Sequence, residues 1–530
     1  MHVIPQSWSH LHILIGVFPT FGLLIVFGFY FAGRRAGDEF TQRICRILLV
    51  LLALLGIPIY VSGIASAADL AGNPRYSPDA ISTHYFWGLA AIGVLAIAGL
   101  IAFVELWRTW LGRRLFSLSG PALAHATAAG SSYANVPENT SSAMVAAEAA
   151  GPSYSARAAQ SRGVSGYRRI SAKHLGTWNS SSLLAGFAII ALALTVVASE
   201  LGFPINHHEL ELAVTIPDIS TPQAWSHAHL ILNHVPTAGF VFALAFYVTA
   251  LVANNDVLKR GSLVLFVICG IAGVPTYVAG TAAMWALTQP TIPEISKAVI
   301  NSHRDMALWS LFGLAFTGAT SWIELWRARS RGQFSQRSLN LILLFAIVTL
   351  AIMTETGHRG GLINHPEIRL ATDILPTDAN AGFSMSLETL MKDMIWFVPW
   401  QIVHFFGYCL IFGTVFAVTL RVFGFWKSIP FAAMHQLLLL GFIGVVMNVV
   451  SGMMMMFADS YRYVVSDTTF APKIALITIG TIAVLWFSLS ARLWKVKAGE
   501  NAPRGAKWAG AVALVAWAGV IVCGRLLAFL

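Results

Sequence analysis

The chain has 530 residues, of which 56% are hydrophobic and only 11% are charged, and its mean hydropathy is +0.69. These values exclude a soluble globular protein and predict an integral membrane protein. The formal net charge of +10 does not indicate a nucleic-acid partner, because most Lys and Arg residues fall on one side of the predicted helices. We attribute the basic balance to topology and to anionic lipid headgroups.

Apolar runs of about 20 residues, the length that a helix needs to cross a bilayer, recur along the whole chain and predict an all-α polytopic fold. The positive-inside rule places both termini on the outer side of the membrane. The first run is too long for a signal-peptide core, so we expect a retained first span. The twelve runs lie near 11–33, 46–67, 84–106, 181–200, 226–252, 262–284, 303–325, 339–356, 396–420, 430–457, 472–491 and 507–529.

The sequence predicts two groups of four helices that are copies of one another. The stretch from Pro222 to Thr237 repeats the frame of Pro, Gln, Trp, Ser and His residues that runs from Pro5 to Thr20. Matching Gly-x-Pro-x-Tyr segments follow in both second helices, and Glu-Leu-Trp-Arg ends both third helices. Because each unit has an even number of helices, the two copies have the same orientation in the membrane, which makes this a parallel repeat.

The chain therefore divides into three predicted units. A third group of four helices follows the repeats and lacks their landmarks. Repeat one carries an insert, 116–178, rich in Ala, Ser and Gly, which we expect to be a disordered inner loop. The units are repeat one over 1–210, repeat two over 211–375 and the third unit over 376–530.

Histidines gather at the predicted outer ends of the helices. Polar groups at membrane depth are costly and indicate function by default, and imidazole suits haem iron, copper or zinc. The gathered residues are His10, His12, His84, His227, His229, His234, His303, His358 and His404. Histidines in predicted tails or loops, which we expect to be solvated, are His2, His125, His174, His207, His208 and His365.

The repeated histidines favour haem. The first and third helices of an up-down four-helix unit lie diagonally across its core, so histidines at their matched ends can bind a porphyrin from both faces. Residues two apart on a helix differ by roughly 200°, so one member of each doublet faces the core. The predicted axial pairs are His10 or His12 with His84, and His227 or His229 with His303.

Repeat two carries further polar groups. His234 and His358 have Val17 and Glu200 as their counterparts in repeat one. Charged residues beside these histidines are candidates for binding haem propionates or quinone oxygens, namely Arg304, Asp305 and Arg359.

The second repeat resembles a widespread family of four-helix bacterial membrane proteins whose histidines are thought to bind b-type haem. The resemblance rests on His234-Val235-Pro236, His303 and His358-Arg359-Gly360-Gly361. It implies haem ligation in repeat two, whereas repeat one departs at Val17 and Glu200.

The third unit resembles another predicted bacterial membrane family through His404-Phe405-Phe406-Gly407 and Leu420-Arg421-Val422-Phe423-Gly424. His404 and His435 are its candidate ligands. They enter from opposite sides and differ in depth by about 10 Å, so they make a poor axial pair.

From these features we expect a b-type cytochrome of the bacterial cytoplasmic membrane, with haem b near the outer face. It would transfer electrons between a quinone and other membrane or periplasmic redox subunits. The alternatives are a copper site built from His227, His229, His234 and His303, a transporter, and a structural subunit of a larger respiratory or surface complex. The sequence has no nucleotide-binding loop or nucleophile constellation, which argues against an independent hydrolase.

Overall fold

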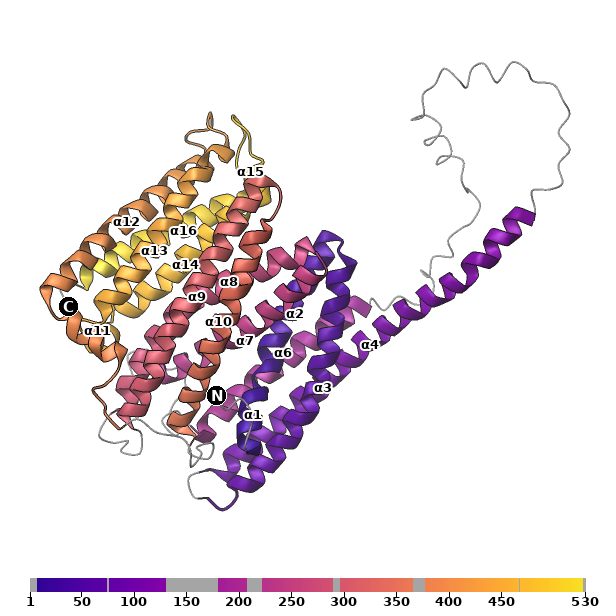
Figure 1. Cartoon of the computed structure of the whole chain (residues 1–530), viewed down its shortest axis with the longest axis horizontal. Coiled ribbons are helices and arrows are strands. Elements are labelled where there is room, and N and C mark those ends of the chain that lie inside the picture. Colours follow the sequence, from indigo (N-terminus) through magenta and orange to yellow (C-terminus); the bar gives the residue numbers. More distant parts are fainter. Residues whose placement is uncertain are drawn as a thin grey trace.

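The computed structural model is helical and without strands in the residues that it describes, which are 7–73, 76–129, 180–206, 222–288, 296–365, 377–466 and 468–527. At several helix ends, including 111–129, 222–226 and His435, only the backbone is described. Twelve helices in these ranges are long and apolar enough to cross a membrane, which confirms the predicted all-α polytopic fold. Figure 1 shows the three units in a row, with repeat two between repeat one and the third unit.

The first span of repeat one is broken into two helices. α1 ends at Gly16 and α2 starts at Phe18, with a proline in its first turn. The inner end of α4 continues into the predicted loop, because Ala is the strongest helix former. Residues 130–179 of that loop lie outside the described residues. The helices are α1 (Trp8–Gly16), α2 (Phe18–Ala36), α3 (Glu39–Leu70), α4 (Pro78–Ala129) and α6 (Ser180–Asn206).

Repeat two and the third unit complete the fold. Repeat two consists of α7 (Pro222–Val252), α8 (Asp256–Leu287), α9 (Lys297–Arg331) and α10 (Gln336–Asn364). A short helix then leads into the third unit, which also contains short 3₁₀ and π segments. Its elements are α11 (Phe383–Met391), α12 (Met394–Phe423), η4 (Phe431–Met434), α13 (His435–Met456), η5 (Arg462–Ser466), α14 (Phe470–Leu489), α15 (Ala491–Trp494) and α16 (Arg504–Leu526).

Within each repeat, consecutive helices pack closely, the first and fourth helices pack sparsely, and the first and third helices pack less still. In repeat one this sparse seam lies between α2 and α6, and in repeat two it lies between α7 and α10. The first and third helices are therefore diagonal, as the up-down arrangement predicts. Each bundle is closed on three sides and comparatively open on the fourth.

The two repeats meet around a pseudo-twofold axis between α2 and α7. Phe29 stacks on Phe246, its counterpart in repeat two, with ring centroids 3.9 Å apart and an interplanar angle of 5°. Asn255 Nδ2 donates to Asp38 Oδ2 at 2.8 Å across 217 positions of sequence, which is the repeat spacing. Both of these polar residues also cap second helices, since Asp38 accepts from Phe40 N and Asn255 from Leu258 N. Equivalent residues thus contact each other, as they do beside a twofold axis.

The third unit packs against the side of repeat two that faces away from repeat one. Tyr277 and Leu308 of repeat two share an apolar core with Met456 and Phe457. On the opposite half of the helices, Trp322 Nε1 donates to Ser488 Oγ at 3.0 Å. These contacts attach the third unit to repeat two along the length of the spans.

Candidate cofactor site

Two histidine rings meet diagonally inside repeat one. His12 of α1 and His84 of α4 have ring centroids 6.0 Å apart, with ring planes at 89°. His12 Nδ1 lies 3.1 Å from the carbonyl oxygen of Ile59 on α3, and His84 Nδ1 lies 2.8 Å from that of Ala198 on α6. Each ring is therefore oriented by the backbone of the next helix in the bundle.

Repeat two builds the same arrangement. His229 of α7 and His303 of α9 have ring centroids 6.4 Å apart, with ring planes at 76°. Their Nδ1 atoms each lie 3.0 Å from a carbonyl oxygen, that of Thr276 on α8 for His229 and that of Thr356 on α10 for His303. The departures of repeat one at Val17 and Glu200 leave its histidine pair in the same geometry.

These hydrogen bonds fix the tautomer of all four rings. A carbonyl oxygen only accepts, so each Nδ1 carries the proton, and Nε2 of a neutral ring is left as the acceptor. Proteins commonly orient a metal-ligating imidazole by this hydrogen bond from its other nitrogen to a backbone carbonyl. Two imidazoles bonded through Nε2 to opposite sides of one ion, at about 2 Å each, would have ring centres roughly 6 Å apart. Both observed separations fit that requirement.

Each of the four rings also lies on a glycine of the neighbouring helix. A Cβ atom would stand only 2.9 Å from Cε1 of His12 at Gly63, and 2.9 Å from Cε1 of His84 at Gly202. The corresponding distances are 2.8 Å from His229 at Gly280 and 2.9 Å from His303 at Gly360. The carbonyl that each Nδ1 contacts belongs to the residue one helical turn before that glycine. Imidazole, glycine and carbonyl therefore form one unit that occurs four times.

The structure separates the members of each histidine doublet. His12 and His229 face their diagonal partners, whereas His10 lines the cavity described below and lies within electrostatic range of His358 and His365. His227 is not among the described residues that line that cavity.

One cavity of about 860 Å³ joins the two histidine pairs. It lies where the sparse seams of the two repeats face each other, and its lining is mainly apolar. Its volume is within the usual range for cofactor and ligand sites, roughly 300–1,000 Å³. The histidines that line it are His10, His12, His84, His229, His234, His303, His358 and His365.

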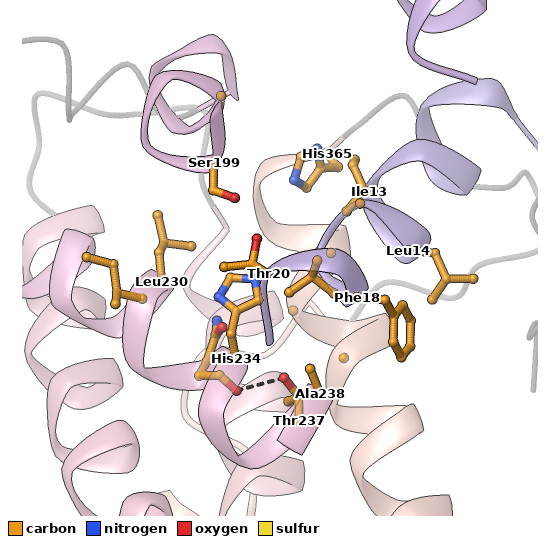
Figure 2. Close-up of a pocket in the computed structure, with 18 of the residues that line it drawn as sticks. Ile13, Leu14, Phe18, Thr20, Ser199, Leu230, His234, Thr237, Ala238 and His365 are labelled. Carbon is orange, nitrogen blue, oxygen red and sulfur yellow. Dashed lines mark hydrogen bonds between the residues drawn. The ribbon is translucent and has the colours of Figure 1, made fainter. Parts of the chain in front are cut away.

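Between the two pairs, α2 and α7 bring His234 and Phe21 together. Their rings stack with centroids 5.6 Å apart and an interplanar angle of 12°. Figure 2 shows His234 and Thr20 in the cavity, with His365 and Ser199 on the opposite side. His365 was expected to be solvated, but it ends α10 and lines the cavity. Of the other histidines expected in tails or loops, His2, His174, His207 and His208 lie outside the described residues, and only the backbone is described at His125.

The two arginines beside the histidines have protein partners. Arg304, which lines the cavity, forms an ion pair with Glu388 of α11 at 2.6 Å. Arg359 pairs with Glu355 at 2.8 Å and donates to Ser302 Oγ at 2.8 Å. Asp305 accepts from the backbone N–H groups of Phe383 and Ser384, which fixes the start of α11 on α9. Arg304 and Asp305 therefore join α11 to α9, the helix that carries His303, and Arg359 joins α10 to the same helix.

The third unit shares part of the repeated arrangement. His404 Nδ1 lies 3.0 Å from Ser451 Oγ, and a Cβ at Gly452 would stand 3.3 Å from His404 Cε1. The contact again spans 47 positions, as it does for His12 and His229. On the third helix, however, Lys473 packs over Gly524 of the fourth helix, where the repeats have histidine over glycine. The side chain of His435 is not among those described.

Within the described part of the chain, no three His, Cys, Asp or Glu side chains are grouped as ligands for a metal ion. Axial ligation of haem requires only two protein nitrogens, because the porphyrin supplies the other four. The paired histidines, their tautomers and the shared cavity fit haem in both repeats.

Fold and site together define a membrane protein of twelve candidate spans with two histidine pairs in a parallel repeat. A family model described as a predicted membrane protein (DUF2231) matches residues 226–365, which are α7 to α10. The expected resemblance of repeat two is thereby confirmed at the level of a membrane-protein family. No curated protein and no solved structure matches the chain.

Proposed function

We propose that the chain is a b-type cytochrome that holds two haems, one between His12 and His84 and one between His229 and His303. The observation that carries the proposal is the fourfold unit of imidazole, glycine and backbone carbonyl, arranged as two diagonal pairs. Bound haem would supply one-electron chemistry. The chain's own residues would hold the ring planes, exclude water and keep Nε2 available.

The proposed setting is the cytoplasmic membrane of a bacterium, with both termini and the histidine pairs on the outer side. The basic inner loops support this orientation through the positive-inside rule. The electrons would pass between a quinone and a membrane or periplasmic redox subunit. The lipid bilayer itself contacts the many exposed apolar side chains of the spans.

The first test is the absorption spectrum of the chain purified from haem-replete cells. We expect a reduced α-band and two haem b per chain by pyridine haemochrome assay. Because the paired rings are nearly perpendicular, at 89° and 76°, the ferric protein should give a strongly anisotropic low-spin electron resonance signal. A colourless preparation, or one in which elemental analysis finds copper in place of iron, would overturn the proposal.

Single substitutions then assign each haem to its repeat. His84→Ala and His303→Ala should each leave one haem per chain, and the double variant should leave none. His227→Ala is the matched control, because His227 neighbours the site and has no assigned role as an axial ligand. Loss of both haems in one single variant, with the fold retained by size-exclusion chromatography, would contradict two independent sites.

A further inference from the structure

The middle of the cavity differs from its two histidine-bearing ends. Figure 2 shows polar side chains on two opposite sides, Thr20 with His234 on one and Ser199 with His365 on the other. Apolar residues surround these polar groups, namely Ile13, Leu14, Phe18, Leu230 and Ala238. This region lies at the meeting of α1, α2, α6, α7 and α10, so both repeats contribute to it.

Thr20 gives this region an unused hydrogen-bonding group. Its side chain is only 8% exposed, and its Oγ1 has no hydrogen-bond partner among the described residues. A buried hydroxyl without a partner is costly, so a ligand that accepts its proton gains that hydrogen bond. The equivalent Thr237 of repeat two donates to Asn233 O at 2.7 Å. The free hydroxyl therefore belongs to one repeat alone.

The imidazole beside Thr20 belongs to the other repeat alone. His234 stacks on Phe21, and the equivalent of His234 in repeat one is Val17. The two asymmetric polar groups, Thr20 and His234, thus lie together near the pseudo-twofold axis. A function that needs only the symmetric histidine pairs does not explain this arrangement.

The same region reaches the lipid-facing surface. Ile13, Leu14 and Ile231 line the cavity, yet they are 40%, 44% and 41% exposed. They lie beside the break between α1 and α2 at Val17, where a Cβ at Gly16 would meet no atom within 4 Å. An apolar ligand can therefore enter from the bilayer without crossing water.

We propose that the middle of the cavity is a binding site for a membrane-soluble quinone, with the Thr20 hydroxyl donating to one oxygen of the ring and the His234 imidazole lying beside that oxygen. A quinone is a flat apolar ring with acceptors at opposite ends, which matches polar groups on two sides of an apolar space. Its isoprenoid tail would leave past Ile13 and Leu14. His365 and Ser199, whose hydroxyl donates to Thr195 O at 2.9 Å, lie on the side of the second oxygen.

The redox step deepens the proposed function and rests on it. Oxidation of one quinol breaks two O–H bonds, forms two C=O bonds and releases two electrons and two protons. In the proposed function, one electron would pass to each of the two ferric haems. The protons would pass to water at the end of the bundle where His358 and His365 lie within electrostatic range of His10.

The test is direct binding of decylubiquinone to the purified chain in lipid nanodiscs, with haem content measured on the same samples. Thr20→Val should weaken binding by roughly tenfold, the value of one lost hydrogen bond at the strong end of the usual range. His234→Val should also weaken binding, because it removes the aromatic ring that lies beside the quinone. Thr237→Val is the matched control and should change binding less than twofold. Thr20→Ser, which keeps the hydroxyl, should bind as the wild type does.

Haem content should be unchanged in all four variants, since none of these residues is an assigned axial ligand. Equal binding by Thr20→Val and Thr237→Val, or wild-type binding by the double variant of Thr20 and His234, would overturn the site. The two proposals fail separately. Haem without decylubiquinone binding removes the quinone site and leaves the cytochrome, whereas variant-sensitive binding without haem removes the cytochrome and leaves the site.

Discussion

At the scale of single residues, the orientation of the imidazoles depends on glycines that have no side chain of their own. Each imidazole directs its Cε1–Nδ1 edge at Gly63, Gly202, Gly280 or Gly360 and so comes close enough to that helix to bond a backbone carbonyl. Any larger residue would push the ring outward and break that bond. The glycines therefore determine the direction of Nε2 as much as the histidines do.

Repeat two offers a matched pair of substitutions to test this role. Gly360→Ala would place a Cβ 2.9 Å from Cε1 of His303, whereas a Cβ at Gly357 on the same helix meets no atom within 4 Å. We expect Gly360→Ala to lose most of one haem per chain in the pyridine haemochrome assay, and Gly357→Ala to retain both. Equal haem content in the two variants would show that the glycine contact does not matter.

The sequence was enough to predict which histidines face the core of each bundle, but it was not enough to predict the glycine contacts. The rotation of roughly 200° between alternate helical residues predicted that one of each doublet faces the core, and His12 and His229 do so. Gly63 and Gly280 each follow the matching Gly-x-Pro-x-Tyr segments by three residues, but nothing in the sequence says which ring contacts them. That contact depends on how closely two helices approach, which is a tertiary property.

At the scale of helices, the contact between α3 and α8 joins the repeats through their caps. Burial raises the pKa of the Asp38 carboxyl, but hydrogen bonds from Thr41, Asn255 and Phe40 outweigh it, so the pKa lies below its ordinary value. Because the folded pKa is depressed, the ionised carboxylate stabilises the folded chain above pH 3.8, and this contribution is lost as the pH falls through the folded pKa.

A charge exchange across the axis tests this contact. Asn255→Asp would set two carboxylates against each other, which we expect to destabilise the fold by about 1–2 kcal/mol and to lower the melting temperature at pH 7. Asp38→Asn combined with Asn255→Asp keeps one carboxylate and one amide and should restore most of the loss. A double variant no more stable than Asn255→Asp would contradict a direct contact between the two caps.

The third unit keeps one half of the imidazole and glycine arrangement of the repeats and lacks the other half. His404 lies over Gly452, and its Nδ1 lies 3.0 Å from Ser451 Oγ, which donates to Met447 O at 2.5 Å. The sequence did not reveal this similarity between the third unit and the repeats, because the residues of the pattern lie on two different helices. In addition, Lys473 stands where the repeats have their second histidine. Tyr408 OH also donates to Trp517 O at 3.0 Å, which joins α12, the first long helix of the third unit, to α16, its last.

We therefore expect the third unit to hold no haem. His404→Ala should retain both haems per chain and the spectrum of the wild type, because Lys473 stands where a second imidazole would be required. The measurement is again haem per chain, with His229→Ala as the variant that loses one. Loss of a haem in His404→Ala alone would contradict this assignment.

At the scale of the whole molecule, the twelve spans and the parallel repeat followed from hydropathy and from landmarks at one spacing. The way the two repeats pack against each other could not be predicted from the sequence, because it depends on which helix faces meet. Phe29 and Phe246 look like ordinary apolar residues until their stacking reveals the axis. The cavity was equally hidden, since it forms where two loosely packed seams coincide.

The pseudo-twofold axis determines how the molecule responds to an electric field. Copies related by an axis along the membrane normal lie at one depth, so in the proposed cytochrome an electron that passed from one histidine pair to the other would move parallel to the bilayer. A complete crossing would involve about 2.3 kcal/mol per 100 mV of membrane potential, and this path would involve almost none.

In proteoliposomes, we expect electron exchange between the two centres to proceed at the same rate with and without a potassium diffusion potential. Flash-induced absorbance would measure it, and a rate that varied with the applied voltage would contradict a shared depth. Such a protein would carry charge along one face of the membrane and would neither generate a voltage nor be slowed by one.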